Sequence, residues 1–285
     1  MRRLEIKHLT EYRFPNAVTL LPHRLMLRPR EGHDVRIESS KLDISPNPRI
    51  KWHRDVFDNS VAVVSFRGVT ERLTVRSEIM IQHYEMEPLD FIVEDYAVHY
   101  PFAYHEEERV DLAPFQQSVY PDQWSTLRAW IKSWDLLGSK METYVLLDRL
   151  NRFIAKEFKY IVREEPGVQS PEQTLAKRSG SCRDYATLFI ETCRFLGLAS
   201  RFVSGYSYVP ELGAGGAATH AWAEVYLPGP GWKGFDPTAG ELTGNRHIPV
   251  AVARHPETVP PVAGSFLGPE GLTPTLRVEV QVTAL

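Results

Sequence analysis

The sequence predicts an α+β protein in which an N-terminal β-sandwich precedes a unit of helices packed on an antiparallel sheet. Three observations support this fold class. Residues 1 to about 85 contain short, partly alternating segments rich in β-branched and aromatic residues. From Pro121 onward apolar residues recur at helical spacing, and residues 220–236 then alternate as two strands joined by a turn. The 285 residues suit two domains, so we expect a β-rich domain with its linker over 1–100 and a second domain over 101–285.

The N-terminal region shows strand patterns and no constellation of reactive side chains. Its expected strands are LEIKHLTEYRF, RLMLRPR, VRIESSKLDI, IKWHRDVF, VAVVSF and LTVRSEIMIQ. Five histidines here follow no metal-ligand spacing, and we interpret them as strand or surface residues: His8, His23, His33, His53 and His83. Residues 86 to about 120 contain Pro88, Pro101 and Pro114, with Pro121 directly after them, and are expected to be irregular, with the charge run at 105–108 on a solvated surface.

The helical region begins after this irregular stretch. Apolar residues share one face over 124–131 and again over 144–158, which predicts two amphipathic helices. A further helix begins at Ser170-Pro171-Glu172-Gln173, where Ser170 is the expected N-cap and Gln173 closes a capping box. Gln173 could instead donate to the oxygen of a reacting carbonyl, but the cap explains the spacing fully. We therefore expect a structural role for Gln173.

Cys182 lies at the start of the next helical pattern. Gly180 precedes it in a turn, and apolar residues then recur at helical spacing as far as the helix stop at Gly197. A cysteine in the first helical turn is favoured as a thiolate, because the unpaired N–H groups and the helix dipole stabilise negative charge. Asp184 in the same turn suits that dipole as well. Taken alone, Cys182 could also be a small buried hydrophobic residue.

An expected hairpin brings a base and an acid to one face. HAWAEVYL alternates from His220, a Pro-Gly-Pro-Gly turn follows, and WKGFD alternates up to Asp236. If Tyr226 pairs near Pro230, His220 and Asp236 become cross-strand neighbours, and a shift of one residue would separate them. Cys182, His220 and Asp236 can then act as nucleophile, base and orienting acid.

Other residues near these three leave alternatives open. Trp222 and Glu224 share the His220 face; the tryptophan either walls the site or packs the hairpin, and Glu224 either binds an amine or has a structural partner. Glu211 to Thr219 is rich in glycine and alanine, and is either a lid over the site or a slack connection. The final segment, LRVEVQV, alternates and is expected to complete a sheet.

The motifs GSCRDYA, RFVSGY, HAWAEVY and GW-x-x-FDPT together resemble the core of the transglutaminase-like superfamily over about seventy residues. The resemblance implies a papain-like arrangement in which Cys182, His220 and Asp236 form a catalytic triad. The β-rich N-terminal region and RHIPVAVARHPETVPPVAG near the C-terminus are similar to a bacterial branch of that superfamily. The chain departs from that branch at His255-Pro256, where an Asp-Tyr pair is common, and at Ala239, where relatives often have asparagine.

Composition and cysteine usage narrow the setting. The formal charge of −3 predicts neither nucleic acid nor a membrane surface as a partner, and no segment resembles a secretory signal or a membrane span. Cys182 and Cys193 lie on one helix, about 16 Å apart at 1.5 Å per residue, which is too far for a disulfide. Free thiols favour the reducing cytoplasm.

The expected reaction is thiol-dependent acyl transfer on an amide or peptide bond through a thioester, without a metal or organic cofactor. Hydrolysis by a cysteine peptidase or amidase is favoured over transamidation, because no sequence feature builds a site for an acceptor amine. Two other classes remain open. One is an inactive scaffold that binds peptides, and the other is a zinc site that uses Cys182 and His220, although neither CxxC nor HxxxH spacing supports it.

Overall fold

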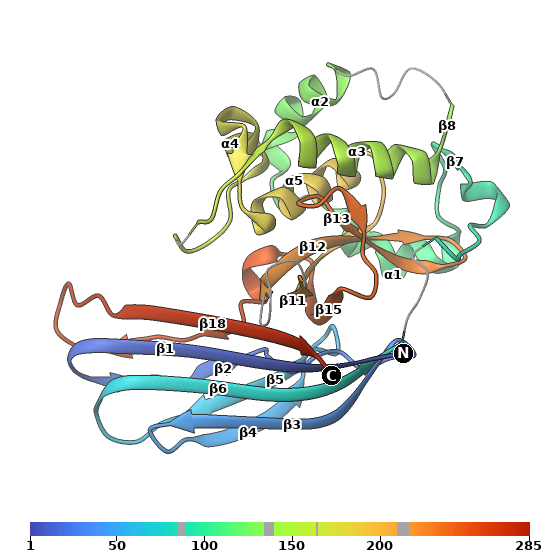
Figure 1. Ribbon diagram of the computed structural model, residues 1–285. Helices are drawn as coiled ribbons and strands as arrows, with labels where there is room; N and C mark the ends of the chain where they lie inside the picture. The colour runs from blue at the N-terminus through green and yellow to red at the C-terminus, as the bar shows by residue number, and fades with distance from the viewer. Residues whose placement is uncertain (85–88, 134–139, 164, 210–216) are drawn as a thin grey trace.

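The computed structural model describes residues 1–84, 89–133, 140–163, 165–209 and 217–285. The N-terminal β-sandwich is confirmed, and Figure 1 shows it below the helical unit. One sheet runs in the order β3 (Val35–Ser45), β6 (Thr70–His83), β1 (Arg2–Leu20) and β18 (Thr275–Ala284), with β17 (Phe266–Leu267) also on β1. The other runs in the order β16 (Val262–Ala263), β2 (His23–Leu25), β5 (Ser60–Ser65) and β4 (Arg49–Arg54).

The sandwich closes over its own apolar layer. The strands alternate as the sequence predicted, so that every second side chain of β1 and β6 faces inward. One cluster joins both sheets and holds Phe14, Val18, Leu20, Leu25, Leu27, Ala62, Val64, Leu73 and Val75. These side chains are removed from water between the two sheets, which is what holds such a sandwich together.

The last strand corrects the expected domain division. β18 pairs antiparallel with β1 from Leu4 opposite Ala284 to Arg13 opposite Thr275, and β16 and β17 also pair with N-terminal strands. The segment 262–284 therefore belongs to the N-terminal sandwich and not to a second domain over 101–285. The sequence could not show this, because an alternating strand fits any sheet edge whose two faces differ in polarity.

The second unit is an antiparallel sheet covered by helices. Its strand order is β14 (Glu241–Leu242), β13 (Gly231–Asp236), β12 (Ala217–Leu227), β11 (Ser200–Tyr208) and β15 (His247–Ala253). The helix α5 (Cys182–Phe195) packs against β11 and β12. Around α5 lie α1 (Glu106–Gln116), α2 (Trp124–Lys132), α3 (Thr143–Glu157) and α4 (Pro171–Lys177). Every residue of α5 from Asp184 to Arg194 is buried, so this helix is the centre of the unit.

Short elements connect these layers. They are the 3₁₀ turns Asp95–Ala97, Pro121–Gln123 and Pro256–Thr258, and the two-residue strand pairs β7 (His99–Tyr100) with β8 (Met141–Glu142) and β9 (Lys159–Tyr160) with β10 (Ser179–Gly180). The helix α1 lies in the stretch expected to be irregular. Its glutamates at 106–108 occupy the first turn, where the helix dipole favours them, and Pro114 lies near its end.

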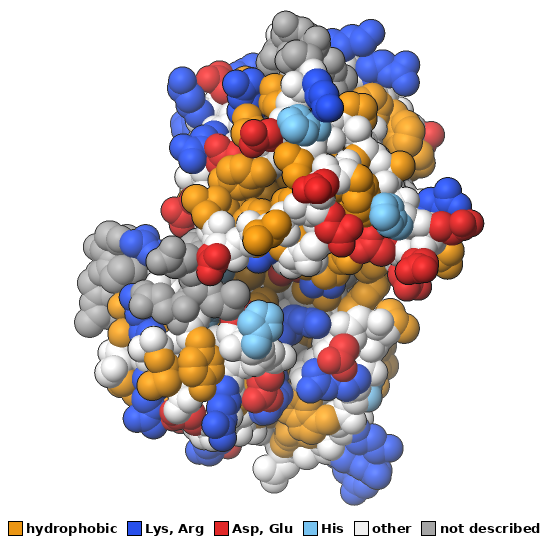
Figure 2. Space-filling model, turned by 90° about the vertical axis from the view of Figure 1, so that its right-hand side faces the viewer, with side chains coloured by type: hydrophobic (Ala, Val, Ile, Leu, Met, Phe, Trp, Pro, Cys, Tyr) orange, Lys and Arg blue, Asp and Glu red, His pale blue; other side chains and the backbone are white. Residues whose placement is uncertain are grey.

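The two units share one core. Leu4, Ile6, Ile79 and Ile81 of the sandwich belong to the same apolar cluster as α5 and its sheet. Figure 1 shows that sheet between the helices and the sandwich. Residues 85–88 of the expected linker lie outside the described residues, and Glu94 beyond them donates its N–H to Pro228 O at 3.0 Å. Figure 2 shows positive and negative side chains interspersed on one face of the molecule.

Candidate active site

Cys182 is the first residue of α5, as the sequence predicted. Ser181 is its N-cap, and the Ser181 N–H donates to Asp184 Oδ2 at 2.8 Å while the Asp184 and Tyr185 N–H groups bond to Ser181 O. These bonds fix the first turn and place the thiol of Cys182 at the positive end of the helix dipole. Cys182 is partly exposed, whereas Cys193 on the same helix is fully buried, and both thiols are free. Cys182 is thus not fully buried, although it packs against the apolar core.

Asp184 holds the approach to this turn. Its carboxylate accepts from the Arg163 guanidinium at 2.7 Å and from the Gln169 N–H at 2.7 Å, in addition to Ser181. Burial would raise the pKa of Asp184, but these donors hold it below its usual value. A Cβ at Gly180 would lie 2.9 Å from Asp184 Cβ, so only glycine fits beside this hydrogen-bonded side chain. Asp184 thus has a structural role beyond the helix-end charge that its position indicated.

His220 and Asp236 meet on one face of the sheet. His220 Nε2 lies 2.6 Å from Asp236 Oδ2. The observed register pairs Tyr226 with Trp232 and Glu224 with Gly234, two residues away from the expected register. The turn leaves Pro228, Gly229 and Pro230 unpaired between Leu227 and Gly231, which shifts the register but keeps its parity. The two side chains consequently share a face as diagonal neighbours rather than as a directly opposed pair.

The protonation of this pair follows from its partners. Burial would raise the pKa of Asp236, but hydrogen bonds from two histidines hold it well below the usual range. Burial would also lower the pKa of His220, yet the hydrogen bonds and charges of Asp236 and Cys182 raise it to about 10. Cys182 is therefore one of the groups whose interaction with His220 raises this pKa. Because Nε2 faces Asp236, Nδ1 is the nitrogen left to take the thiol proton.

The second histidine on Asp236 is His247, which the sequence interpretation did not single out. His247 Nε2 lies 3.1 Å from the same Oδ2, and the Thr238 N–H donates to Oδ1 at 2.9 Å. His247 begins β15, at the opposite edge of the sheet from β13 and β14. Two strands lie between β13 and β15, so His247 reaches Asp236 because the segment 243–247 crosses from β14 to the start of β15. No sequence spacing indicates such a crossing.

Two side chains on the His220 face have structural partners. Glu224 accepts from Arg201 Nε at 2.6 Å, and Arg201 lies over the Trp232 ring at 4.1 Å, so Glu224 is the structural partner rather than a free amine-binding group. Trp222 is buried against Val203, Val252 and Phe57, and its ring meets that of His247 edge-on. Trp222 therefore packs behind the pair, and it also borders a hollow of about 210 Å³ together with Glu224 and His247.

Gln173 and the segment before His220 were the other features that the sequence predicted near the site. Gln173 closes the capping box of α4 with Ser170, which confirms its structural interpretation. Tyr160 on β9 is half-exposed; burial, followed by the charges of Cys182 and Asp236, raises the pKa of its hydroxyl. Residues 210–216 of the glycine- and alanine-rich segment lie outside the described residues. Ala217 to Thr219 were expected in that loop but belong to β12.

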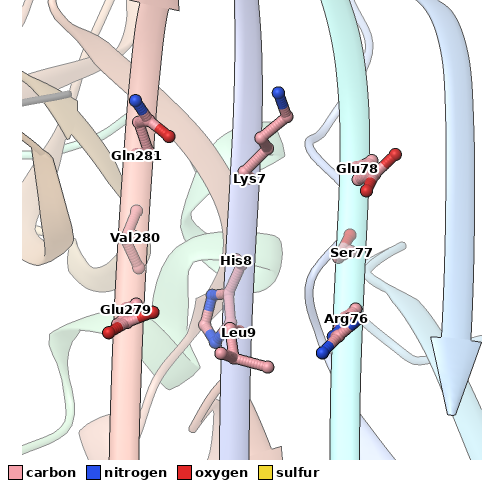
Figure 3. Close-up of a pocket in the computed structure, with 9 residues that line it drawn as sticks. All are labelled: Lys7, His8, Leu9, Arg76, Ser77, Glu78, Glu279, Val280 and Gln281. Atoms are coloured by element: carbon pink, nitrogen blue, oxygen red, sulfur yellow. The ribbon is translucent and has the colours of Figure 1, made fainter. Parts of the chain in front are cut away.

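A hollow of about 340 Å³ lies away from this site, on the sandwich sheet (Figure 3). Its side chains come from β18, β1 and β6 and carry both signs of charge, among them Lys7, Arg76, Glu78 and Glu279. His8 beneath it bonds through both ring nitrogens to the hydroxyls of Tyr206 and Thr10. Since neither nitrogen is left for a reaction, we do not assign catalysis to this hollow.

A thiol at a helix N-terminus, paired with a histidine and an acid from an antiparallel sheet, defines the papain-like class of thiol enzymes. Residues 4–82 match the bacterial transglutaminase-like N-terminal region, and residues 135–237 match the transglutaminase-like superfamily. An uncharacterized protein of Mycobacterium tuberculosis is 31% identical over 284 residues, covering 92% of this chain and 87% of its own. The chain belongs to the transglutaminase-like superfamily.

Two further similarities extend over the whole chain. An uncharacterized protein of Mycobacterium leprae is 22% identical over 290 residues, covering all of both chains. A solved structure described as "a Putative Cysteine Protease from Cytophaga hutchinsonii" superposes with a TM-score of 0.76 at 18% identity, covering 100% of this chain and 91% of that one. The fold, including the N-terminal sandwich, is therefore shared along its full length. In the described part of this chain, no helix is long and apolar enough to cross a membrane.

Proposed function

We propose that the chain catalyses thiol-dependent acyl transfer on amide or peptide bonds, with hydrolysis as the main outcome. The observation that carries this proposal is the His220–Asp236 pair at 2.6 Å, whose histidine has its pKa raised by Asp236 and by Cys182 in the first turn of α5. A silent peptide-binding scaffold has no need for all three side chains in contact. No metal or organic cofactor is required by this chemistry.

In the proposed reaction, Cys182 and His220 act first in forming the thioester and then in its hydrolysis. His220 Nδ1 takes the Cys182 proton, and the sulfur attacks the amide carbonyl carbon. The oxyanion forms beside the N–H groups of the first turn of α5, among which that of Cys182 is nearest the sulfur. His220 then donates its proton to the departing amine as the C–N bond breaks. Water, deprotonated by His220, attacks the thioester; the C–S bond breaks and the proton returns to the thiolate.

The choice of water over an amine rests on the acids near His220. A site for an acceptor amine would need a carboxylate free to bind it. Among the described side chains on this face, Glu224 is bonded to Arg201 and Asp236 to two histidines. Neither is available to position an ammonium group, which supports hydrolysis over transamidation.

A partition assay tests this choice. A glutamine- or amide-bearing peptide is incubated with the protein and rising concentrations of a primary amine, and the products are counted by mass spectrometry. We expect mostly acid at every amine concentration, because water is present at about 55 M. Dominant amide product at millimolar amine would establish a transglutaminase instead, and the absence of both products across a diverse peptide library would favour the scaffold. Cys182→Ala is the matched control for background hydrolysis.

The zinc alternative gains one observation. His220 Nε2, Asp236 Oδ2 and His247 Nε2 lie within 4.8 Å of one another. However, both nitrogens approach the same carboxylate oxygen at 2.6 and 3.1 Å, which are the distances of charge-assisted hydrogen bonds. We therefore favour the triad, and metal analysis of the purified protein separates the two readings. A free thiol at the site also supports a reducing compartment such as the cytoplasm.

A further inference from the structure

His247 has one fixed proton arrangement. Its Nδ1 accepts a hydrogen bond from the Gly244 N–H at 3.3 Å, so in the neutral ring the proton lies on Nε2. Nε2–H then donates to Asp236 Oδ2 at 3.1 Å. The ring is buried and packs edge-on against Trp222 at 5.2 Å between centroids. His247 therefore presents a donor to the catalytic acid from a position that it cannot easily leave.

The strand that carries His247 is held from the other side by the N-terminal sandwich. β15 is an edge strand of its sheet, with backbone groups available on its outer side. The Arg30 N–H donates to Pro249 O at 2.8 Å. Asn59, which is fully buried, bonds to both backbone groups of Val252, donating to the carbonyl at 2.8 Å and accepting from the N–H at 2.9 Å. The Asn59 amide thus pairs with β15 much as a neighbouring strand would.

A third contact reaches His247 itself. His83, at the end of β6, approaches the His247 carbonyl with Nε2 at 3.4 Å, and it is buried. Arg30 also donates to Asn59 Oδ1 at 2.9 Å, which orients the amide. A chain of contacts therefore runs from the sandwich through β15 and His247 to Asp236, and from Asp236 to His220.

We propose that His247 is a positioning residue for the catalytic acid, and that the N-terminal sandwich acts on the active site by holding β15 in place. This inference rests on the proposed function and adds a role for the N-terminal domain within it. His247 does not touch the reacting atoms; it acts through Asp236. With the His247 donor, Oδ2 is bound from two sides and Oδ1 by Thr238, so the carboxylate has a single orientation toward His220.

The consequence for the base follows from the groups around it. His220 faces Cys182 and Asp236, with Tyr160 near the thiol and His247 behind the acid. Without the second donor, Asp236 is free to rotate and to find other partners. Its hold on the imidazolium then weakens, and the pKa of His220 moves down toward the ordinary histidine range. The thiolate–imidazolium pair becomes less populated at neutral pH.

The test measures the base directly, with no substrate. The full chain is prepared with ¹³C-labelled histidine as wild type, His247→Met and His247→Gln, and the His220 ring is titrated by NMR. We expect the pKa of His220 to fall by about one unit or more in His247→Met, and iodoacetamide labelling of Cys182 at pH 7 to slow about tenfold. His247→Gln places an amide N–H near the position of Nε2. It should restore the pKa of His220 to within about half a unit of wild type, and the rate of Cys182 labelling to within about threefold.

A second variant tests the anchoring from the N-terminal domain. Asn59→Ala removes both bonds to Val252 without touching the active site, and we expect a smaller fall of the His220 pKa in the same direction. If His247→Met does not fold, the other two variants decide. The proposal requires that the pKa of His220 is near the wild-type value in His247→Gln and is lowered in Asn59→Ala. Titrations of folded His247→Met or Asn59→Ala that match wild type would overturn it. Because no turnover is measured, this result is independent of whether the substrate is hydrolysed.

Discussion

Two histidines, one in β1 of the sandwich and one in β12 of the helix-covered sheet, have opposite protonation. His8 lies in β1 with both ring nitrogens bonded to hydroxyls, Nδ1 to Tyr206 at 3.1 Å and Nε2 to Thr10 at 2.8 Å. Burial lowers its pKa to about 4. His220 lies in β12 with 13% of its side chain exposed, and although burial also acts to lower its pKa, this pKa is raised to about 10, because its partners are an ionised acid and a thiol. Burial is common to both, so the partner decides which histidine can hold a proton at neutral pH.

The comparison separates a structural histidine from a base. Neutral hydroxyls satisfy the ring of His8 without stabilising a charge, so this ring stays neutral and links the sandwich to Tyr206 of the neighbouring sheet. The Asp236 carboxylate stabilises the charged form of His220. The hydrogen bonds from His220 and His247 keep the Asp236 carboxylate ionised. Substitutions of either histidine, or of the groups around it, test this difference, and the largest effect is expected at His220.

The largest effect should come from the base and its acid. His220→Ala is expected to lower kcat by about 10⁴-fold, and Asp236→Asn by about 10²- to 10⁴-fold, because the imidazole loses its orienting acceptor and its stabilised charge. His8→Gln is the matched control and should keep activity within about threefold, since His8 contacts no reacting group. Steady-state kinetics on a confirmed substrate measure all three. Full activity in both triad variants would show that the assignment of His220 and Asp236 is wrong.

The two thiols of α5 extend the comparison from bases to nucleophiles. Burial raises the pKa of Cys193 far above the ordinary thiol range, whereas Cys182 lies at the helix start beside His220. A limiting amount of iodoacetamide near pH 7 should label Cys182 about 100-fold faster than Cys193, as measured by peptide mass spectrometry. In His220→Ala this preference should shrink. Preferential labelling of Cys193 in the folded protein would remove Cys182 from the role of nucleophile.

The smallest effect concerns acid stability and involves His8. A base whose folded-state pKa lies below its unfolded value binds fewer protons when folded, so the free energy of unfolding falls as pH drops from about 6.5 to about 4. The shift corresponds to about 3 kcal/mol at most. His8→Gln should flatten this part of the stability curve in urea titrations from pH 7 to 4. If the free energy of unfolding depended on pH equally in the variant and in wild type, the pKa of His8 would not be lowered in the folded protein.

His220 and Asp236 could be predicted as neighbours because their reactive types fall at strand ends on one alternating face. The parity of a hairpin survives a change of turn length by two residues, so the pair was found although the register was not. Cys182 and the Ser170–Gln173 cap follow local helix-start rules that need no tertiary information. The fold class could be predicted for the same reason, since both sheets and all of the larger helices except α1 leave a clear period in the sequence.

His247 and β18 could not be predicted, because their roles are set by which strand lies beside which. His247 meets Asp236 only through the path of the chain from β14 to β15, and the pairing of β18 with β1 joins residues more than 260 positions apart. The helix α1 could not be predicted because Pro114 lies inside it, where a proline lacks the N–H donor and is disfavoured, so the sequence favoured an irregular stretch. Nothing in the sequence around Asn59 indicates its bonds to Val252, which lies almost two hundred positions away.

The pairing of β18 with β1 also has a consequence for how the chain is made. β1 is synthesised first, but its outer edge finds its partner only when residues 275–284 have left the ribosome. Until then ten successive positions of β1 present unpaired backbone groups, and β1 is a template for pairing with another chain. The Leu285 N–H finally donates to Arg3 O at 3.0 Å, which brings the two chain ends side by side (Figure 1). Completion of the N-terminal strands alone therefore does not close the sandwich, which needs β18 as well.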